Sequence, residues 1–204
     1  MTDDSKFSDG QKLADYISAL KDFKISGPAG PVYDHMGATM ADAILQSGLN
    51  YQNVVYPRIQ AIIQRYPGGN TTSAFLKILA EEGHEKVLDW KHHEKPARLM
   101  ALVEFIKFKN IETVKELQKF LLHEDNLDGL RELRGIGPKT VDYLKMLVGI
   151  QAVAVDRHIW RFVEKAGINC KDYVATRSVV EAAANILGLT SSELDHSIWL
   201  YMSA

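Results

Sequence analysis

The sequence has a single cysteine, Cys170, and no long hydrophobic run. One thiol cannot close a disulfide within the chain, nor complete a four-thiolate zinc site or iron–sulfur cluster, so these are excluded for this chain alone. No stretch of about 18 uncharged apolar residues occurs, and the first residues, MTDDSKFSDG, are acidic rather than basic and then apolar. We therefore expect neither a membrane span nor a secretory signal, and we predict a cytoplasmic protein.

The chain also lacks a strong charge of either sign, with 24 Lys and Arg against 26 Asp and Glu and a formal net charge of −2. This balance excludes broad, non-specific binding to polyanions of the kind that histones show. The segment from Arg131 to Lys165 is an exception, because it holds seven basic and four acidic residues, a net charge of +3. A local nucleic-acid site and an ordinary solvated helical surface explain this excess equally well.

Apolar residues recur at intervals of three and four over most of the chain, and no alternating run of strand length stands out. The predicted fold class is therefore all-α. Residues 36–63 are predicted to form two helices with a break at Gly48 and Asn50. Three further helices are expected. Ser73 is expected to cap the first, Pro96 to be the first residue of the second, and Thr113 to form a capping box with Glu116 at the start of the third.

Glycine and proline cluster in SGPAGP at 26–31, and glycine marks VGIQ at 148–151. These segments predict two helical subdomains. One covers residues 32–149, and the other is formed by both chain ends, 1–31 plus 150–204.

Residues 127–148 read as two helices joined by a hairpin, with Gly135, Ile136 and Gly137 at the turn and Pro138 opening the second helix. Glycines permit positive φ and leave the amides bare, while the new helix directs unpaired N–H groups outward. Such a turn would hold a phosphate through its backbone without reading base sequence. A tight turn between two helices is an equally good interpretation of these glycines alone.

Two side chains near this hairpin have the chemistry of an active site. Lys139 lies in the first helical turn, where the positive end of the helix dipole disfavours an ammonium, and a neutral amine is a nucleophile. Asp156 follows the apolar VAV and precedes an apolar-periodic helix, so its carboxylate is placed at a helix N-cap. Taken singly, a surface lysine and a structural cap account for both residues.

Together, LRELRGIGPKTVDYL and AVAVDRHIWRF resemble the helix-hairpin-helix and Gly/Pro-rich loop with aspartate that mark the DNA glycosylase superfamily containing endonuclease III. The resemblance is firm over residues 127–163 and weaker elsewhere. It implies two helical subdomains with an active-site cleft between them, the helix-hairpin-helix in the first and the catalytic aspartate in the second. It also implies excision of a damaged base that has been flipped out of duplex DNA.

By this resemblance, Lys139 matches the attacking amine of the lyase-competent members, and Asp156 matches the family's catalytic aspartate. His158 is expected to steady the active-site loop through a structural hydrogen bond. The carbonyls of Leu133 and Ile136 correspond to those that hold a monovalent cation in the family. The implied DNA-binding residues are Gly135, Ile136, Gly137, Lys139, Thr140, Gln46 and Asn50, although a polar helix break explains Gln46 and Asn50 as well.

Two departures from the family pattern stand out. Cluster-bearing members carry four cysteines after the last helix, whereas this sequence ends after LDHSIWLYMSA, so no iron–sulfur cluster and no other cofactor is expected. Pro138 replaces a residue that is basic in many relatives of endonuclease III, which removes one phosphate contact.

The sequence therefore predicts a bifunctional DNA glycosylase and AP lyase that acts on double-stranded DNA with a damaged base or an abasic site. It is expected to be a monomer and, in a prokaryote, to work at the nucleoid. A monofunctional glycosylase and a non-catalytic DNA-binding module are the alternatives. The sequence does not determine which damaged base is excised.

Overall fold

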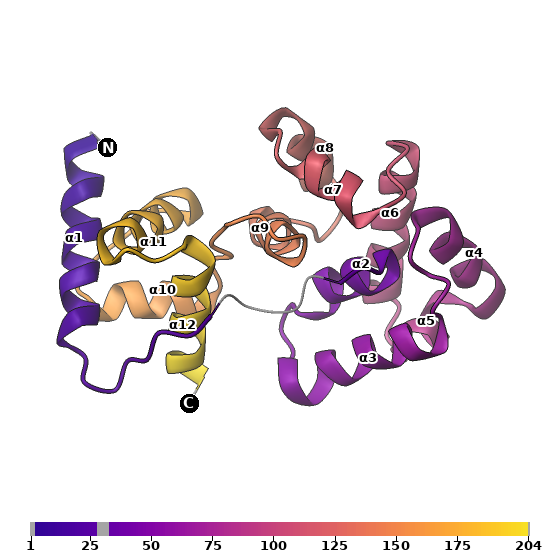
Figure 1. Cartoon of the computed structure of the whole chain (residues 1–204), viewed down its shortest axis with the longest axis horizontal. Helices are drawn as coiled ribbons and strands as arrows, with labels where there is room; N and C mark the ends of the chain where they lie inside the picture. The colour runs from indigo at the N-terminus through magenta and orange to yellow at the C-terminus, as the bar shows by residue number, and fades with distance from the viewer. Residues whose placement is uncertain (1–2, 28–32, 204) are drawn as a thin grey trace. The chain divides into compact units, whose positions relative to one another are not determined.

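The computed structural model describes residues 3–27 and 33–203 as helices joined by turns and short extended segments (Figure 1). No β-strand occurs within these two ranges, so the prediction of an all-α fold is confirmed. No helix in this part of the chain combines the length and the apolar character needed to cross a lipid bilayer.

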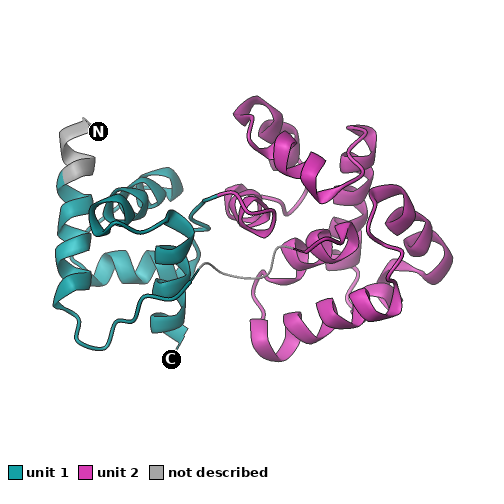
Figure 2. Cartoon of the chain, in the orientation of Figure 1, with its two compact units in different colours: residues 1–30, 151–204 teal, residues 31–150 magenta. Residues whose placement is uncertain are grey.

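The chain divides into two compact units (Figure 2). Unit 1 consists of Met1–Gly30 and Gln151–Ala204, and unit 2 consists of Pro31–Ile150. The division expected from glycine and proline, 32–149 against 1–31 plus 150–204, has its boundaries one residue away from these.

Unit 2 contains most of the helices. They are α2 (Met36–Leu45), the π-helical segment η1 (Tyr51–Val55), α3 (Tyr56–Arg65), α4 (Thr72–Glu82), α5 (His84–Leu88), α6 (Glu94–Phe108), α7 (Val114–Leu121), the 3₁₀ segment η2 (Glu124–Asn126), α8 (Leu127–Arg131) and α9 (Pro138–Leu147). The predicted break between two helices in residues 36–63 is confirmed by the gap between α2 and η1.

Helix α2 forms the centre of unit 2, because α3, α4, α6 and α9 all contact it and every one of its residues is buried. Its sequence, MGATMADAIL, supplies small residues that permit this close packing. Gly37 lies directly against the ring of Phe75, which is fully buried, and an added Cβ would overlap that ring. The one acidic residue of α2, Asp42, is buried with the rest of the helix.

Unit 1 consists of α1 (Asp3–Ala19), α10 (Arg157–Lys165), α11 (Tyr173–Leu187) and α12 (Ser191–Ser203). Helix α1 packs on α11 where Gly10 meets Ala182, since a Cβ on Gly10 would lie 2.6 Å from the Cβ of Ala182. Helix α10 packs on α12. The core of the unit includes Leu13, Phe162, Val179, Val180, Leu194 and Ile198.

Helix starts show where local sequence signals succeed and fail. The capping box of Thr113 and Glu116 is confirmed at the start of α7. Ser73 is not the cap of α4, because Thr71 accepts the capping hydrogen bond two residues earlier. Pro96 does not open α6, which begins at Glu94.

Candidate functional site

Helices α8 and α9 are joined by a turn at residues 132–137. Gly135 has a φ of +80°, and the N–H of Ile136 donates to the carbonyl of Leu133 at 2.9 Å. Within the described residues, the amides of Gly135 and Gly137 donate no hydrogen bond. Open amides immediately before a helix can bind an anion, and Gly137 has no side chain to occupy them.

Two of the predicted DNA-binding residues face inward from this turn. Ile136 is 2% exposed and anchors the turn in the core of unit 2, and Thr140 is 7% exposed. The amide of Thr140 donates to the carbonyl of Gly137 at 3.0 Å. The open donors of the turn are therefore the glycine amides rather than the amide of Thr140.

Arg98 of α6 lies over the turn, because a Cβ on Gly135 would come within 2.7 Å of the guanidinium carbon of Arg98. Beside it is a cavity of about 170 Å³, which is lined by His93, Glu94, Ala97, Arg98, Ala101 and Arg134. Glu94 pairs with Arg98 at 3.5 Å and with Arg134 at 3.8 Å. The side chain of Arg134 is 92% exposed, so it is open to a solvent-borne partner.

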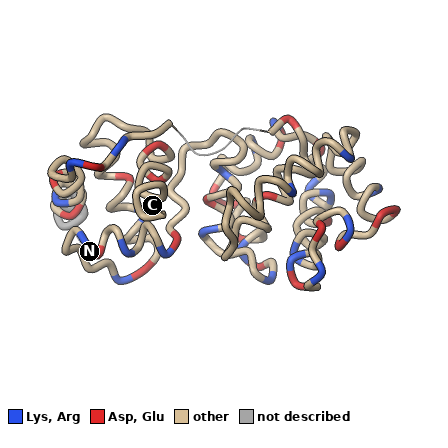
Figure 3. Tube along the Cα trace, turned by 90° about the horizontal axis from the view of Figure 1, so that it is seen from below, with Lys and Arg blue, Asp and Glu red and all other residues tan. Residues whose placement is uncertain are grey.

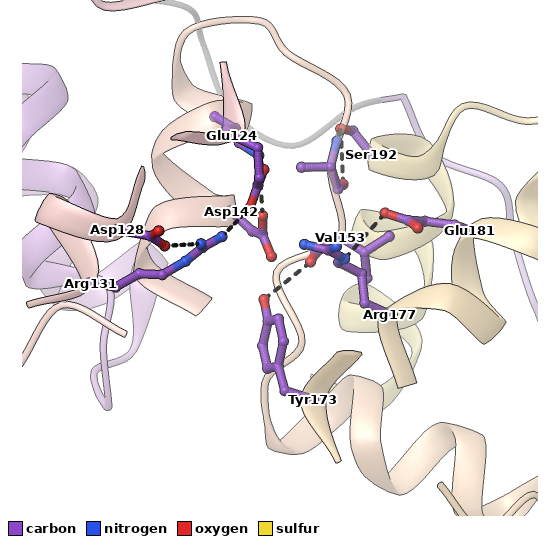
Figure 4. Close-up of polar contacts among 11 residues, drawn as sticks. Glu124, Asp128, Arg131, Asp142, Val153, Tyr173, Arg177, Glu181 and Ser192 are labelled. Carbon is purple, nitrogen blue, oxygen red and sulfur yellow. Dashed lines mark hydrogen bonds and ion pairs between the residues drawn. The ribbon is translucent and has the colours of Figure 1, made fainter. Parts of the chain in front are cut away.

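A second group of charges joins η2, α8 and α9 within unit 2 (Figure 4). Arg131 pairs with Asp128 at 3.0 Å and with Glu124, and Lys145 lies 3.4 Å from Glu124. The hydrogen bond from Arg131, together with the Lys145 charge, lowers the pKa of Glu124 although burial opposes this. Two of the seven basic residues in the +3 segment therefore hold helices together, and throughout each unit basic and acidic residues are interspersed (Figure 3).

Lys139 is the second residue of α9, and its Nζ donates to Oε1 of Gln46 at 2.6 Å. Gln46 is the C-cap of α2. The structure thus brings together two residues that the sequence nominated separately. Asn50, a third nominated residue, is exposed and caps η1 by accepting from the N–H of Asn53 at 2.9 Å.

One helical turn below this contact, Asp42 accepts hydrogen bonds from three phenols. Tyr33 and Tyr51 donate to its Oδ2 at 2.8 and 3.0 Å, and Tyr143 donates to its Oδ1 at 3.1 Å. Burial raises the pKa of Asp42 above its ordinary value of 3.8, and the phenols oppose that rise. Burial and the adjacent carboxylate raise the pKa of Tyr51 to about 12, so the phenols stay protonated as donors.

Lys95 of α6 closes the C-terminal end of α2. Its ammonium donates to the carbonyls of Ile44 at 3.0 Å, Leu45 at 3.3 Å and Ser47 at 2.9 Å. Burial, together with the Arg98 and Lys139 cations, lowers the pKa of Lys95 to about 8. The charges of Arg98 and Lys139 therefore both act on Lys95 at the end of α2.

Asp156 belongs to unit 1, where it caps α10 as predicted. The N–H groups of His158 and Ile159 donate to its Oδ1 at 2.7 and 3.0 Å. Within the described chain, no hydrogen bond is made to its other oxygen, Oδ2. The half-buried carboxylate therefore caps α10 with one oxygen, and its second oxygen is available to another partner.

The segment before Asp156 is held in place within unit 1. The amide of Ala154 donates to Asp195 at 2.9 Å. The amide of Ala152 donates to the hydroxyl of Ser192 at 3.1 Å, and the hydroxyl of Tyr173 donates to the carbonyl of Val153 at 3.3 Å (Figure 4). These contacts fix residues 152–154. The ring of His158 accepts from Nε of Arg157 at 3.4 Å and meets Trp199 edge to face.

The predicted cation ligands, Leu133 and Ile136, lie in the turn before α9. The carbonyl of Leu133 accepts the N–H of Ile136 and retains a second lone pair, as one ligand of a carbonyl-bound cation requires. Within residues 3–27 and 33–203, no group of three or more His, Cys, Asp or Glu side chains is placed to hold a metal ion.

Sequence reasoning missed the Asp42 group and Lys95. A weak signal for Asp42 was present, since an acidic residue interrupts the otherwise uncharged MGATMADAIL one helical turn before Gln46. No local signal marks Tyr33 or Tyr143 as its partners, nor Lys95 as a cap of a helix 50 residues earlier.

The model of a family described as a domain of unknown function (DUF8548) matches residues 95–203, more than half of the chain. The matched region includes Lys95, Lys139 and Asp156, and it excludes Asp42 and Gln46. No curated protein matches the chain.

Proposed function

We propose that this chain, which belongs to the DUF8548 family, is a DNA base excision repair enzyme, a bifunctional DNA glycosylase and AP lyase. One observation carries the proposal: a lysine in the first turn of α9, with its amine held by Gln46, follows a turn whose glycine amides are open to a phosphate. The resemblance to the endonuclease III superfamily supports it. The substrate is duplex DNA with a damaged base or an abasic site.

In the proposed reaction, Lys139 is the nucleophile. Its neutral amine attacks C1′ of the flipped nucleotide, the bond from C1′ to the base breaks, and the base leaves with the bonding electrons. Loss of a proton from the nitrogen and opening of the sugar ring give a Schiff base. The Schiff base acidifies C2′, so loss of a C2′ proton expels the 3′ phosphate by β-elimination.

Asp156 stabilises the positive charge that develops on the sugar as the base departs. Its single unengaged oxygen, Oδ2, suits this role because the N-cap hydrogen bonds fall on Oδ1. Lys139 belongs to unit 2 and Asp156 to unit 1. The proposal requires both to reach one sugar, and the predicted cleft remains part of the proposal.

Borohydride trapping tests the lysine. Wild-type protein incubated with duplexes that carry 8-oxoguanine, thymine glycol, uracil or an abasic site should give a covalent adduct with at least one of them. Lys139→Ala should abolish the adduct, and Lys119→Ala, which removes an exposed lysine of α7, should leave it intact. An undiminished adduct in Lys139→Ala would refute the assignment.

Asp156→Asn separates catalysis from capping, because asparagine caps helices as well as aspartate does. The variant should have the same denaturant midpoint of unfolding as wild type. It should release the base at least tenfold more slowly, a loss in the range expected of an electrostatic catalytic group. A wild-type rate of base release in this variant would leave Asp156 as a cap only.

The same substrates distinguish the alternatives. A monofunctional glycosylase would release the base without an adduct, and a non-catalytic module would bind the duplex without releasing any base. We further propose that the protein acts at the nucleoid, that it is a monomer and that it works without an iron–sulfur cluster.

A further inference from the structure

Two lysines from different helices meet the same end of α2. Lys95 of α6 donates to the main-chain carbonyls of Ile44, Leu45 and Ser47. Lys139 of α9 donates to the side chain of Gln46. Residues 44–47 therefore gather both amines, although α6 and α9 are separate in the sequence.

The position of the Lys95 ammonium is fixed. An ammonium has three N–H donors, and at Lys95 three carbonyls accept from them at 2.9 to 3.3 Å. A neutral amine would turn a lone pair toward one of these carbonyls, so the arrangement favours the charged form. The end of α2 also carries the negative pole of the helix dipole.

Lys95 has no acidic partner in the described part of the chain, since no carboxylate oxygen lies within 4.0 Å of its Nζ. Arg98, the neighbouring cation on α6, pairs with Glu94. On α2 the nearest acidic group is Asp42, whose carboxylate is occupied by three phenols. The charge of Lys95 is therefore balanced by carbonyl dipoles alone.

We propose that Lys95 is a positioning residue for Lys139, whose protonated form it disfavours by holding a fixed positive charge at the same end of α2. A like charge nearby disfavours a second ammonium. The repulsion between the two cations acts on the pKa of Lys95, which burial, Arg98 and Lys139 lower to about 8, so that Lys95 is mostly charged at neutral pH. This inference rests on the proposed role of Lys139.

Other charged and titratable side chains of this region are Arg98 on α6, whose charge acts on Lys95, and the group of Asp42, Tyr51 and Tyr143, which lies one helical turn along α2 from Gln46. None of them is changed when Lys95 is substituted. A comparison of variants at Lys95 therefore isolates the effect of its charge on Lys139.

The experiment measures the rate of borohydride-trapped adduct on an abasic duplex between pH 6 and 10. Lys95→Gln removes the charge, so a larger share of Lys139 should be protonated at neutral pH. The rate at pH 7 should fall roughly tenfold, the profile should move about one pH unit upward, and the wild-type rate should return at high pH. Lys95→Arg, which keeps the charge, should retain the wild-type profile.

Lys77→Gln removes an equal charge from α4 and controls for net charge, since Lys77 is exposed and pairs with Glu81. Lys95→Met is a second neutral variant of similar length, to be used where Lys95→Gln does not fold. An unmoved pH profile in a folded neutral variant, or a loss of rate by the same factor at every pH, would overturn the proposal.

A second measurement does not depend on catalysis. Reductive ¹³C-methylation of the lysines, with NMR titration of the Lys139 signal identified by its absence in Lys139→Ala, should give a higher titration midpoint in Lys95→Gln than in wild type. If wild type forms no adduct on any duplex, the proposed function fails, and this titration still decides whether Lys95 acts on Lys139. If the titration midpoint of Lys139 is the same in Lys95→Gln and in wild type, the charge of Lys95 does not act on Lys139 and the proposal is overturned.

Discussion

Nζ of Lys139 donates to Oε1 of Gln46 at 2.6 Å across 93 positions of sequence. The contact joins the C-cap of α2 to the first turn of α9. One turn away on each helix, the hydroxyl of Tyr143 donates to Asp42 at 3.1 Å. These two polar contacts thus join α9 to α2, and one of them is made by the amine that reacts in the proposed mechanism.

Substitutions at Gln46 should move the pH dependence of adduct formation in opposite directions. Gln46→Glu places a carboxylate on the Lys139 ammonium and stabilises it, so the rate at pH 7 should fall roughly tenfold and the profile should move upward. Gln46→Met removes the acceptor and should move the profile downward. The measurement is the rate of borohydride trapping between pH 6 and 10.

Gln64→Glu, at an exposed position of α3, is the matched control for an added negative charge. It should leave the profile at its wild-type position. Shifts of the same sign in Gln46→Glu and Gln46→Met would contradict an effect that acts through the charge on Lys139.

The stability of the Asp42→Asn variant, relative to that of wild type, should increase as the pH rises. Burial raises the folded-state pKa of Asp42, so the folded protein holds a proton that the unfolded chain loses above its ordinary value of 3.8. Wild-type stability therefore falls as the pH rises from 3.8 through the raised pKa, and asparagine does not titrate. Urea unfolding across this range measures the difference between the two proteins.

The other carboxylates of the chain titrate in both proteins, so subtraction removes their contribution. A stability difference that stays constant with pH would mean that Asp42 is not held above its ordinary pKa. Tyr143→Phe, which removes one donor to this carboxylate, should cost about 1 to 3 kcal/mol at pH 7.

Local signals in the sequence predicted much of the fold. The capping box at Thr113, the cap at Asp156 and the proline that opens α9 each involve residues within three positions, and the structure has all three. The prediction at Ser73 was wrong for a long-range reason: its hydroxyl and amide bond to Glu112, which lies 39 positions away, and Thr71 takes the cap.

The candidate site was only partly predictable for the same reason. Lys139 and Gln46 were each nominated from their local sequence, but their contact depends on how α9 packs on α2. Lys95 and the phenols around Asp42 come from α6, α9 and the segments that flank α2, and no spacing in the sequence relates them. Motifs thus indicated the residues that we propose to react, and tertiary packing determines which groups surround them.

Gly135→Ala should weaken binding to duplex DNA, and the loss should exceed that of a variant with similar backbone strain elsewhere in the chain. The residue has a φ of +80°, where alanine costs about 1 kcal/mol, and the added Cβ would also displace the guanidinium of Arg98. Because the open amides lie in this turn, we expect roughly tenfold weaker binding in fluorescence anisotropy, which corresponds to about 1.4 kcal/mol.

Gly188→Ala is the control for strain alone. Gly188 has a φ of +69°, and an added Cβ would meet no atom within 4 Å. Its variant should lose a similar amount of stability from the backbone and keep wild-type affinity for DNA. Equal affinities of the two variants would argue against a role of the turn in binding phosphate.

Glu112 should contribute stability with the opposite pH dependence to Asp42. Burial alone would raise its pKa, but hydrogen bonds from Lys107 and from the hydroxyl and amide of Ser73 lower it to about 2. Because this folded-state value lies below the ordinary 4.5, the contribution is complete above pH 4.5 and is lost as the pH falls toward 2.

Glu112→Gln should therefore be less stable than wild type by about 1 kcal/mol at pH 7, since the carboxylate is partly exposed and solvent screens its pairing with Lys107. Urea unfolding between pH 2 and 7 should show this difference shrinking below pH 4.5. Glu81→Gln, which removes an exposed partner of Lys77, should differ from wild type by less than about 0.5 kcal/mol. A difference for Glu112→Gln that persists unchanged at pH 2 would show that the side chain acts through its shape and neutral hydrogen bonds, because a charged contribution has to disappear once the carboxylate is protonated.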